Sequence, residues 1–285
     1  MKKLFSIVLA ALMVAALFAG CGSSTAETKA PETTAAPAAA ETTAAPAETE
    51  APAETEAAAA FTTIEAGKLI MSTNAAFPPY EMVADDGSFE GIDVEIAGAV
   101  AAKLGLELVV DDMDFDAALL AVQQGKSDIV MAGVTVNEDR KMVMNFSDTY
   151  SKGVQVVIVK EGSDVTLDNL GDQMIGTQRG TTGYIYTSGD YGEDHVTAYD
   201  NGASAVQALA NGQVDCVIID SAPAEAFVAA NPGLAILDTE YTVEDYAIGM
   251  SKDNTALLDA VNAALAELTA DGTIPAIVEK YIPTK

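Results

Sequence analysis

The feature that most constrains the fold is a regular alternation, from residue 61 to the C-terminus, of short apolar runs and segments with helical periodicity. This alternation is typical of α/β folds, in which helices connect the strands of largely parallel sheets. The predicted strands are 68–72, 107–110, 129–131, 154–159, 174–176 and 216–219. The predicted helices, with apolar residues three and four apart, are 93–104, 116–124, 204–211 and 254–270.

A short internal similarity indicates that the α/β unit occurs twice. Gly125-Lys-Ser-Asp128 and Gly212-Gln-Val-Asp215 each join the end of a predicted helix to an apolar strand, with the glycine as helix cap. The body, 61–285, is long enough for two lobes. Ligands of open α/β sheets bind beyond the carboxyl ends of the strands, so Gly133 and Asp220 are candidate site positions, one in each lobe. Any two such units can look alike over this length, so the similarity alone does not decide the matter.

The first twenty residues, 1–20, are predicted to be an export signal. Lys2 and Lys3 precede a mostly apolar segment, 4–19, that is shorter than the roughly 20 residues of a membrane-spanning helix. The segment Leu17-Phe18-Ala19-Gly20-Cys21 resembles a bacterial lipobox, although Phe18 stands where Leu, Val or Ile is usual. Lipidation of Cys21 with several acyl chains, palmitate among them, would anchor the protein stably. The alternative is an ordinary secretory signal with an incidental cysteine.

Residues 21–60 are predicted to be a disordered tether. They consist mainly of Ala, Thr, Glu and Pro, and Glu-Thr-Thr-Ala-Ala-Pro-Ala occurs twice, starting at Glu32 and at Glu41. Such a segment cannot bury enough apolar surface to offset the entropy that is lost on ordering. This order of segments, a lipid anchor followed by a solvated spacer and a globular body, predicts a protein that functions at the outer face of a cell membrane. A cell-wall segment with its own partner is the alternative.

Charge and rare residues exclude several classes of function. The chain has 43 acidic and 14 basic residues and a net charge of −29, which argues against a nucleic-acid partner. Cys216, the second of two cysteines, lies in an apolar run and is expected to be a buried small hydrophobe. With His195 as the only histidine, the sequence offers neither a disulfide framework nor a metal-ligand cluster, and no cofactor is predicted.

Two charged positions stand out as candidate ligand contacts. Only Arg140 and Arg179 are arginines, and a guanidinium grips a carboxylate through two parallel bonds, so they mark where to look for a ligand. Asp220 follows four apolar residues, and its carboxylate is costly to bury unless a cation meets it. The alternatives are a surface arginine in the charged turn 137–140 and a helix-capping role for Asp220.

Seven motifs follow one another along the body: Thr73-Asn-Ala-Ala-Phe-Pro-Pro-Tyr80, Gly91-Ile-Asp-Val-Glu-Ile-Ala-Gly-Ala-Val-Ala-Ala-Lys-Leu104, Met113-Asp-Phe-Asp116, Ala132-Gly-Val-Thr-Val-Asn-Glu-Asp-Arg140, Asn145-Phe-Ser-Asp-Thr-Tyr150, Gly180-Thr-Thr182 and Ala270-Asp-Gly-Thr273. Their ordered combination resembles the extracellular solute-binding proteins of polar amino-acid ABC transporters. The resemblance implies a type II periplasmic-binding-protein-like fold: two α/β lobes joined by two crossing strands, with an amino acid in the cleft. The expected lobes are 61–150 with 246–285, and 151–245.

The resemblance also implies roles for individual residues. Arg140 would bind the ligand carboxylate, helped by the Thr135 hydroxyl and by backbone N–H groups near Gly133 and Thr182. The ammonium group would meet Asp220 and the Ala132 carbonyl. Phe77 and Phe115 would sandwich the ligand side chain, and Asn74 and Gln178 would contact its far end. Phe115 is equally explained as a core residue and Asn74 as a turn residue, and Arg179 is not assigned to the ligand.

These features predict a monomeric, membrane-anchored receptor that captures a free polar L-amino acid and delivers it to ABC permease subunits. Glutamine or another polar neutral amino acid is favoured because Asn74 replaces an aspartate of several relatives, and arginine is the second choice. We expect no enzymatic activity, since no catalytic acid, base or nucleophile is evident in the site motifs. The alternatives are a dehydratase-like or peptidoglycan-cleaving enzyme on the same fold, and an amino-acid-sensing or adhesion lipoprotein.

Overall fold

The computed structural model describes residues 61–283. The predicted signal peptide (1–20), the lipidation site Cys21 and the predicted tether (21–60) lie outside the described residues. Within the described part, no helix is both long enough and apolar enough to cross a membrane.

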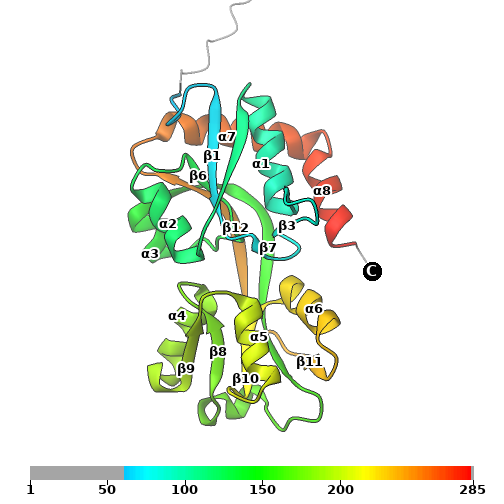
Figure 1. Cartoon of the computed structure of the whole chain (residues 1–285). Helices are drawn as coiled ribbons and strands as arrows, with labels where there is room; N and C mark the ends of the chain where they lie inside the picture. The colour runs from blue at the N-terminus through cyan, green and yellow to red at the C-terminus, as the bar shows by residue number, and fades with distance from the viewer. Residues whose placement is uncertain (1–60, 284–285) are drawn as a thin grey trace, which may run out of the picture. The chain divides into compact units, whose positions relative to one another are not determined.

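Strands and helices alternate along the chain and form two groups, here called the first and second lobes (Figure 1). The first lobe comprises β1 (Lys68–Thr73), β2 (Ala76–Phe77), β3 (Glu81–Val83), β4 (Phe89–Glu90), α1 (Ile92–Lys103), β5 (Glu107–Asp112), α2 (Phe115–Gln123), β6 (Ile129–Val130), α3 (Glu138–Val143), α7 (Thr255–Ala270) and α8 (Thr273–Tyr281). The second lobe comprises β8 (Ile175–Gln178), α4 (Thr182–Tyr191), β9 (Val196–Tyr199), α5 (Gly202–Ala210), β10 (Cys216–Asp220), α6 (Ser221–Ala230) and β11 (Leu234–Ile236), with short 3-10 helices at Leu167–Asp172 and Glu193–His195.

Two long strands, β7 (Met144–Lys160) and β12 (Thr242–Ser251), run from one lobe to the other and pair in antiparallel fashion. The strand order is β5-β1-β6-β12-β7-β10-β8-β9, with β11 beside β7. In the first lobe β1 pairs in parallel with β5 and β6, and in the second β8 pairs in parallel with β9 and β10. The predicted α/β fold with two crossing strands is confirmed. The predicted lobe boundaries fall inside β7 and β12 and stay a prediction.

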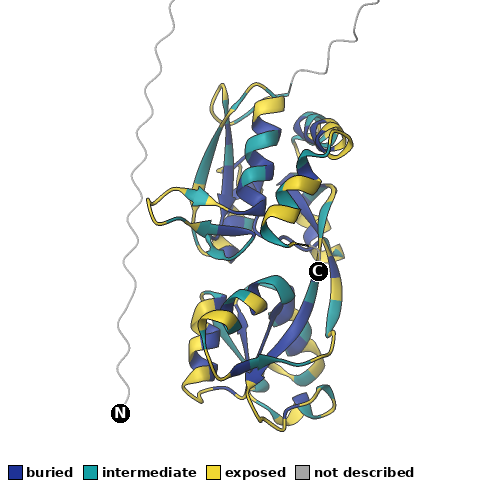
Figure 2. Cartoon of the chain, turned by 90° about the vertical axis from the view of Figure 1, so that its right-hand side faces the viewer, coloured by how far each residue is buried: buried dark blue, intermediate teal, exposed yellow. Residues whose placement is uncertain are grey.

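The core follows from the apolar periodicity of the sequence, and buried residues line the strands and the helix faces packed on them (Figure 2). Leu69, Ile96 and Val261 join β1, α1 and α7 in the first lobe, where each is fully buried. In the second lobe, Cys216 is fully buried in a cluster on one face of the sheet, as predicted. These apolar clusters fix the positions of the strands, and the ends of those strands line the cavity described below.

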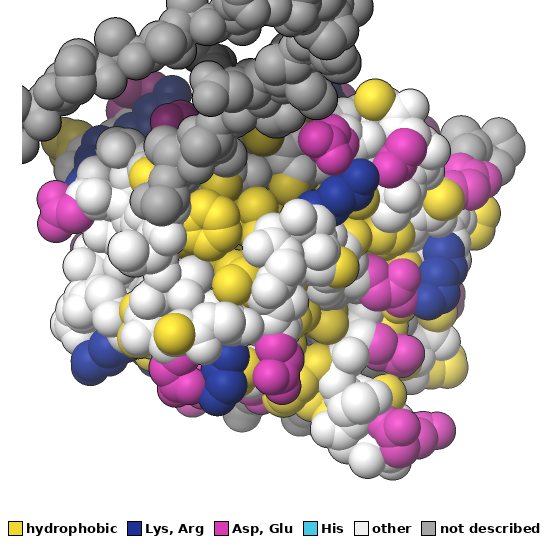
Figure 3. Space-filling view, turned by 90° about the horizontal axis from the view of Figure 1, so that it is seen from above, with side chains coloured by type: hydrophobic (Ala, Val, Ile, Leu, Met, Phe, Trp, Pro, Cys, Tyr) yellow, Lys and Arg dark blue, Asp and Glu magenta, His cyan; other side chains and the backbone are white. Residues whose placement is uncertain are grey.

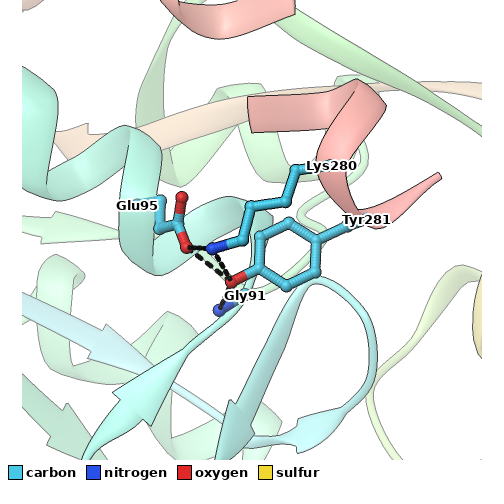
Figure 4. A network of polar contacts seen from close by, with 4 residues as sticks. All are labelled: Gly91, Glu95, Lys280 and Tyr281. Carbon is cyan, nitrogen blue, oxygen red and sulfur yellow. Dashed lines mark hydrogen bonds and ion pairs between the residues drawn. The ribbon is translucent and has the colours of Figure 1, made fainter. Parts of the chain in front are cut away.

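The start of α1 is fixed by contacts with α8 (Figure 4). The Tyr281 hydroxyl accepts a bond of 3.2 Å from the Gly91 N–H and donates to Glu95, which also pairs with Lys280. Gly91 has φ 126°, and a Cβ there would overlap the Tyr80 carbonyl, so this turn requires glycine. The first turn of α1 is thereby held close to the site.

The surface carries both signs of charge. On the face seen in Figure 3, basic side chains are interspersed with acidic ones. That face therefore offers no continuous basic patch of the kind that nucleic-acid-binding proteins present.

Candidate functional site

A small cavity, partly open to solvent, lies between the two lobes. Every residue that the sequence predicts to contact a ligand lines it: Asn74, Phe77, Phe115, Ala132, Gly133, Thr135, Arg140, Gln178, Thr182 and Asp220. The cavity is also lined by residues that the sequence did not single out: Glu81, Gln155, Thr181, Ile218, Ile219 and Tyr246. Segments up to 172 positions apart, from Asn74 to Tyr246, thus meet in one place.

Arg140 forms one pole of the cavity and is 7% exposed, so it is not a residue of a surface turn. Its Nη1 donates to the Thr135 carbonyl at 2.8 Å, and its Nη2 reaches the second lobe and donates to the Gly180 carbonyl at 3.1 Å. Asn137 caps α3 by accepting from the Arg140 N–H, which sets the position of the side chain. Burial lowers the pKa of Arg140, although the guanidinium stays charged. Its remaining N–H groups suit an incoming carboxylate.

Glu244, on β12, lies behind this pole and was missed by the sequence analysis. Its Oε2 accepts from the Thr135 hydroxyl and from Gln155 Nε2, both at 3.0 Å. The Thr135 hydroxyl, expected to assist a ligand carboxylate, therefore bonds to Glu244, and it also lies 3.4 Å from the Thr182 hydroxyl. Glu244 is 5% exposed and offsets part of the unfavourable burial of the Arg140 charge.

Asp220 forms the opposite pole, at the end of β10. Its Oδ2 accepts from the Val154 N–H at 2.8 Å and from the Tyr246 hydroxyl at 2.9 Å, and its Oδ1 caps α6 at Ala222. The capping role and a position on the cavity thus coexist. A Cβ at Gly153 would come within 2.5 Å of Asp220 and Tyr246, so only glycine leaves room for this contact. Burial raises the pKa of Asp220 to about 6, against the effect of its hydrogen bonds.

Aromatic rings and two amides line the remainder of the cavity. Phe115 begins α2, packs in the core and lies 5.5 Å from the Arg140 guanidinium carbon, so its core and site positions coexist. Phe77 stacks against Tyr80. Asn74 donates to the Met113 carbonyl at 2.8 Å and accepts from Gln178 Nε2 of the second lobe at 3.0 Å. The amides therefore form a neutral, hydrogen-bonding wall.

The turn after β6 carries Ala132 and Gly133. Gly133 has φ 55°, and a Cβ there would lie 2.9 Å from the Phe77 ring, so both its conformation and its surroundings require glycine. The Gly133 N–H, expected near a ligand carboxylate, donates to Asp93 Oδ2 at 2.9 Å. In the second lobe, α4 directs its N-terminus at the cavity through Thr182, and the free N–H groups of that helix end suit an anion.

Two residues noted in the sequence lie away from the cavity lining. Arg179 is exposed and its Nη2 pairs with Asp200 at 3.2 Å, a surface ion pair of little energetic weight. His195 belongs to a 3-10 helix, and its Nδ1 lies 3.3 Å from the Gln173 carbonyl. In the part of the chain that the structure describes, no three His, Cys, Asp or Glu residues are grouped as metal ligands.

Residues 69–284 match the model of the bacterial extracellular solute-binding proteins, family 3. The chain belongs to this family. The match spans both lobes and all the residues that line the cavity.

Individual relatives agree with this assignment. The L-cystine-binding protein TcyJ of Escherichia coli K12 is 30% identical over 76% of this chain and 83% of its own. The glutamine-binding protein GlnH of Bacillus subtilis, an ABC transporter protein, is 27% identical over 99% of this chain and 98% of its own. Among solved structures, an ancestral arginine-binding protein bound to glutamine has a TM-score of 0.73 and 37% identity, covering 76% of this chain and 99% of that one. These relatives are binding proteins rather than enzymes, in agreement with the prediction for this chain.

Proposed function

We propose that this protein captures a polar L-amino acid in the cavity between its lobes and delivers it to an ABC permease. The observation that carries the proposal is the placement of two opposite charges on one cavity, Arg140 from the first lobe and Asp220 from the second. A free amino acid is a zwitterion, and each of its charges needs a partner once water is excluded. Arg140 suits the carboxylate as a bidentate donor, and Asp220 suits the ammonium group.

The split of the site between the lobes supplies a mechanism for capture. Because Arg140 and Asp220 come from different lobes, a zwitterion that contacts both stabilises the arrangement in which the lobes approach each other. The Gln178 bond to Asn74 and the Arg140 bond to Gly180 already join the lobes around the cavity. Ligand binding thereby produces one shape of the protein for a permease to recognise.

The neutral wall favours glutamine or a similar polar neutral amino acid, with arginine as the second choice. Asn74 and Gln178 together offer donors and acceptors but no fixed charge to pair with a cationic side chain. The names of the relatives cover both possibilities, since GlnH is a glutamine-binding protein and the ancestral arginine-binding protein was solved with glutamine.

We further propose that the protein is a monomer held at the outer face of the cell membrane by lipid on Cys21, with 21–60 as its tether. Support comes from the lipobox-like segment and from the composition of the tether. A family of extracellular solute-binding proteins is consistent with this location.

A thermal-shift screen of the purified protein against the standard amino acids, ornithine, citrulline and cystine tests the proposal. A ligand that binds only the folded state at about 100 times its Kd adds roughly 2.7 kcal/mol to the unfolding free energy. We expect glutamine, or another polar neutral amino acid, to raise Tm the most. A shift with arginine and lysine but none with glutamine would contradict our choice of ligand, and no shift with any amino acid would contradict the function.

A further inference from the structure

At the cavity wall, which Glu81 itself lines, lies a cluster of buried acidic groups to which no ligand contact was assigned above. Glu81, at the start of β3, and Asp93, in the first turn of α1, are both fully buried, and their carboxyl groups lie within hydrogen-bonding reach of each other. The Tyr150 hydroxyl of β7 lies beside Asp93. Three carboxyl oxygens of the pair are buried and lack a hydrogen-bond donor: Glu81 Oε1, Glu81 Oε2 and Asp93 Oδ1.

One shared proton resolves this arrangement. Two carboxylates are acceptors only, and like charges at such a distance cannot both persist in a buried site. A single proton turns one group into a donor to the other, as in other buried carboxyl pairs. It satisfies the otherwise unpartnered oxygens that face each other and removes one of the two buried charges.

The surroundings decide which residue holds the proton. Asp93 accepts a backbone N–H from Gly133 and sits at the N-terminus of α1, where the helix dipole favours negative charge. Glu81 has neither advantage. Burial raises the pKa of Glu81 well above its usual range, and the nearby Asp93 charge adds to the shift, whereas the pKa of Asp93 rises only to about 6. Glu81 is therefore the neutral acid and Asp93 the anion.

We propose that Glu81 and Asp93 share one proton and that this pair positions the Ala132–Gly133 turn for the ammonium group of the ligand. Asp93 Oδ2 holds the Gly133 N–H at 2.9 Å, and the peptide that contains this N–H is the one that contains the Ala132 carbonyl. Fixing the N–H thus fixes the direction of the carbonyl. The role of this carbonyl rests on the proposed function, whereas the shared proton does not.

Three other titratable groups lie near the pair, and the Tyr150 hydroxyl lowers the pKa of Asp93 and thus favours its anionic form. The groups concerned are Asp112 at the end of β5, Tyr80 next to Glu81, and Tyr150 on β7. Tyr80 in turn lies near Asp220, and the negative charge of Asp220 raises the pKa of the Tyr80 hydroxyl. Asp112 disfavours ionisation of Glu81, and the tyrosines are neutral at physiological pH.

Infrared spectroscopy of the full chain at pH 8 tests the shared proton. We expect a carbonyl stretch of a protonated, buried carboxylic acid in the wild type and its loss in Glu81→Gln, whereas Glu90→Gln, a change at an exposed residue of β4, should leave it in place. The unfolding free energy of the wild type should also fall as pH rises from the usual glutamate range, because the folded state keeps its proton longer. Glu81→Gln should flatten this profile. A wild type without the band, or a band that survives in Glu81→Gln, would overturn the shared proton.

Ligand titration tests the positioning role. Glu81→Gln keeps a donor toward Asp93, whereas Glu81→Met, of similar size, leaves Asp93 without one. The methionine variant should therefore bind the amino acid roughly 10-fold more weakly than the glutamine variant. Urea unfolding confirms that each variant is folded before titration. Equal affinity of Glu81→Met and Glu81→Gln would overturn the positioning role. If the wild type binds no amino acid, the proposed function and the positioning role both fall, while the infrared band still decides the shared proton.

Discussion

Replacing Arg140 by alanine should weaken amino-acid binding by about 30-fold or more. Removing one partner of a buried, hydrogen-bonded charge pair costs roughly 2–5 kcal/mol, much of it because the other charge is left unpaired. Here that other charge is the ligand carboxylate, which only Arg140 meets as a bidentate donor. Calorimetric titration of the variant with the best ligand of the thermal-shift screen measures the loss.

Two further variants separate geometry from charge. Arg140→Lys keeps the positive charge but not the planar fork, so it should lose roughly 10-fold or more through the missing charge-assisted bond. Arg179→Ala removes the other arginine, which is exposed and pairs with Asp200, and should bind like the wild type. Arg140→Ala leaves the buried Glu244 without its nearby cation, so urea unfolding must confirm that the variant is folded before titration. Near-native affinity of Arg140→Ala would contradict the assigned carboxylate pole.

Replacing Asp220 by asparagine should weaken binding by a similar factor, about 30-fold or more, because the ligand ammonium loses its buried counter-charge. The substitution keeps the size of the side chain and one acceptor, so the effect reports chiefly on charge. Asp245→Asn, at an exposed acidic residue of β12, is the matched control and should leave affinity unchanged. Titration of both variants by calorimetry checks the prediction, and equal affinities would contradict it.

The pH profile gives a second measure of the same pole. Burial raises the pKa of Asp220 to about 6, so the protein must release a proton from this group to bind an ammonium ion below that pH. Affinity should therefore be constant near neutrality and fall below pH 6 by up to about tenfold per pH unit. In Asp220→Asn this fall should largely disappear, since the titrating carboxyl is gone. A wild-type affinity that is flat from pH 7 to pH 5 would contradict the role of Asp220.

The fold was predictable where apolar periodicity is strong and local. α7 carries apolar residues at helical spacing over four turns and was predicted within one residue of its start. α3 has six mostly polar residues, too few to show a period, and was missed. β12 was missed because Glu244 and Asp245 interrupt its apolar pattern, and β7 was predicted only over its apolar second half. The strands β7 and β12 depend on pairing with strands distant in the sequence, which no local pattern encodes.

The site was predictable as a set of residues but not as a network. Arg140 was singled out because the chain has only two arginines. The family motifs then distinguished it from Arg179, which lies on the surface. Glu244 was not predicted, because a glutamate in a strand is ordinarily exposed and only the donors brought by Thr135 and Gln155 allow its burial. The Gly133 bond to Asp93 likewise joins two motifs that give no sign of each other in the sequence.

In the proposed function, one cavity binds both charges of a free amino acid. Calorimetric titration of the wild-type protein with its best amino-acid ligand, with the N-acetyl derivative and with the α-amide tests this most directly. Each derivative removes one charge while keeping the side chain. We expect tight binding of the free amino acid and a loss of affinity of about 30-fold or more for each derivative. Comparable affinity for either derivative would contradict it.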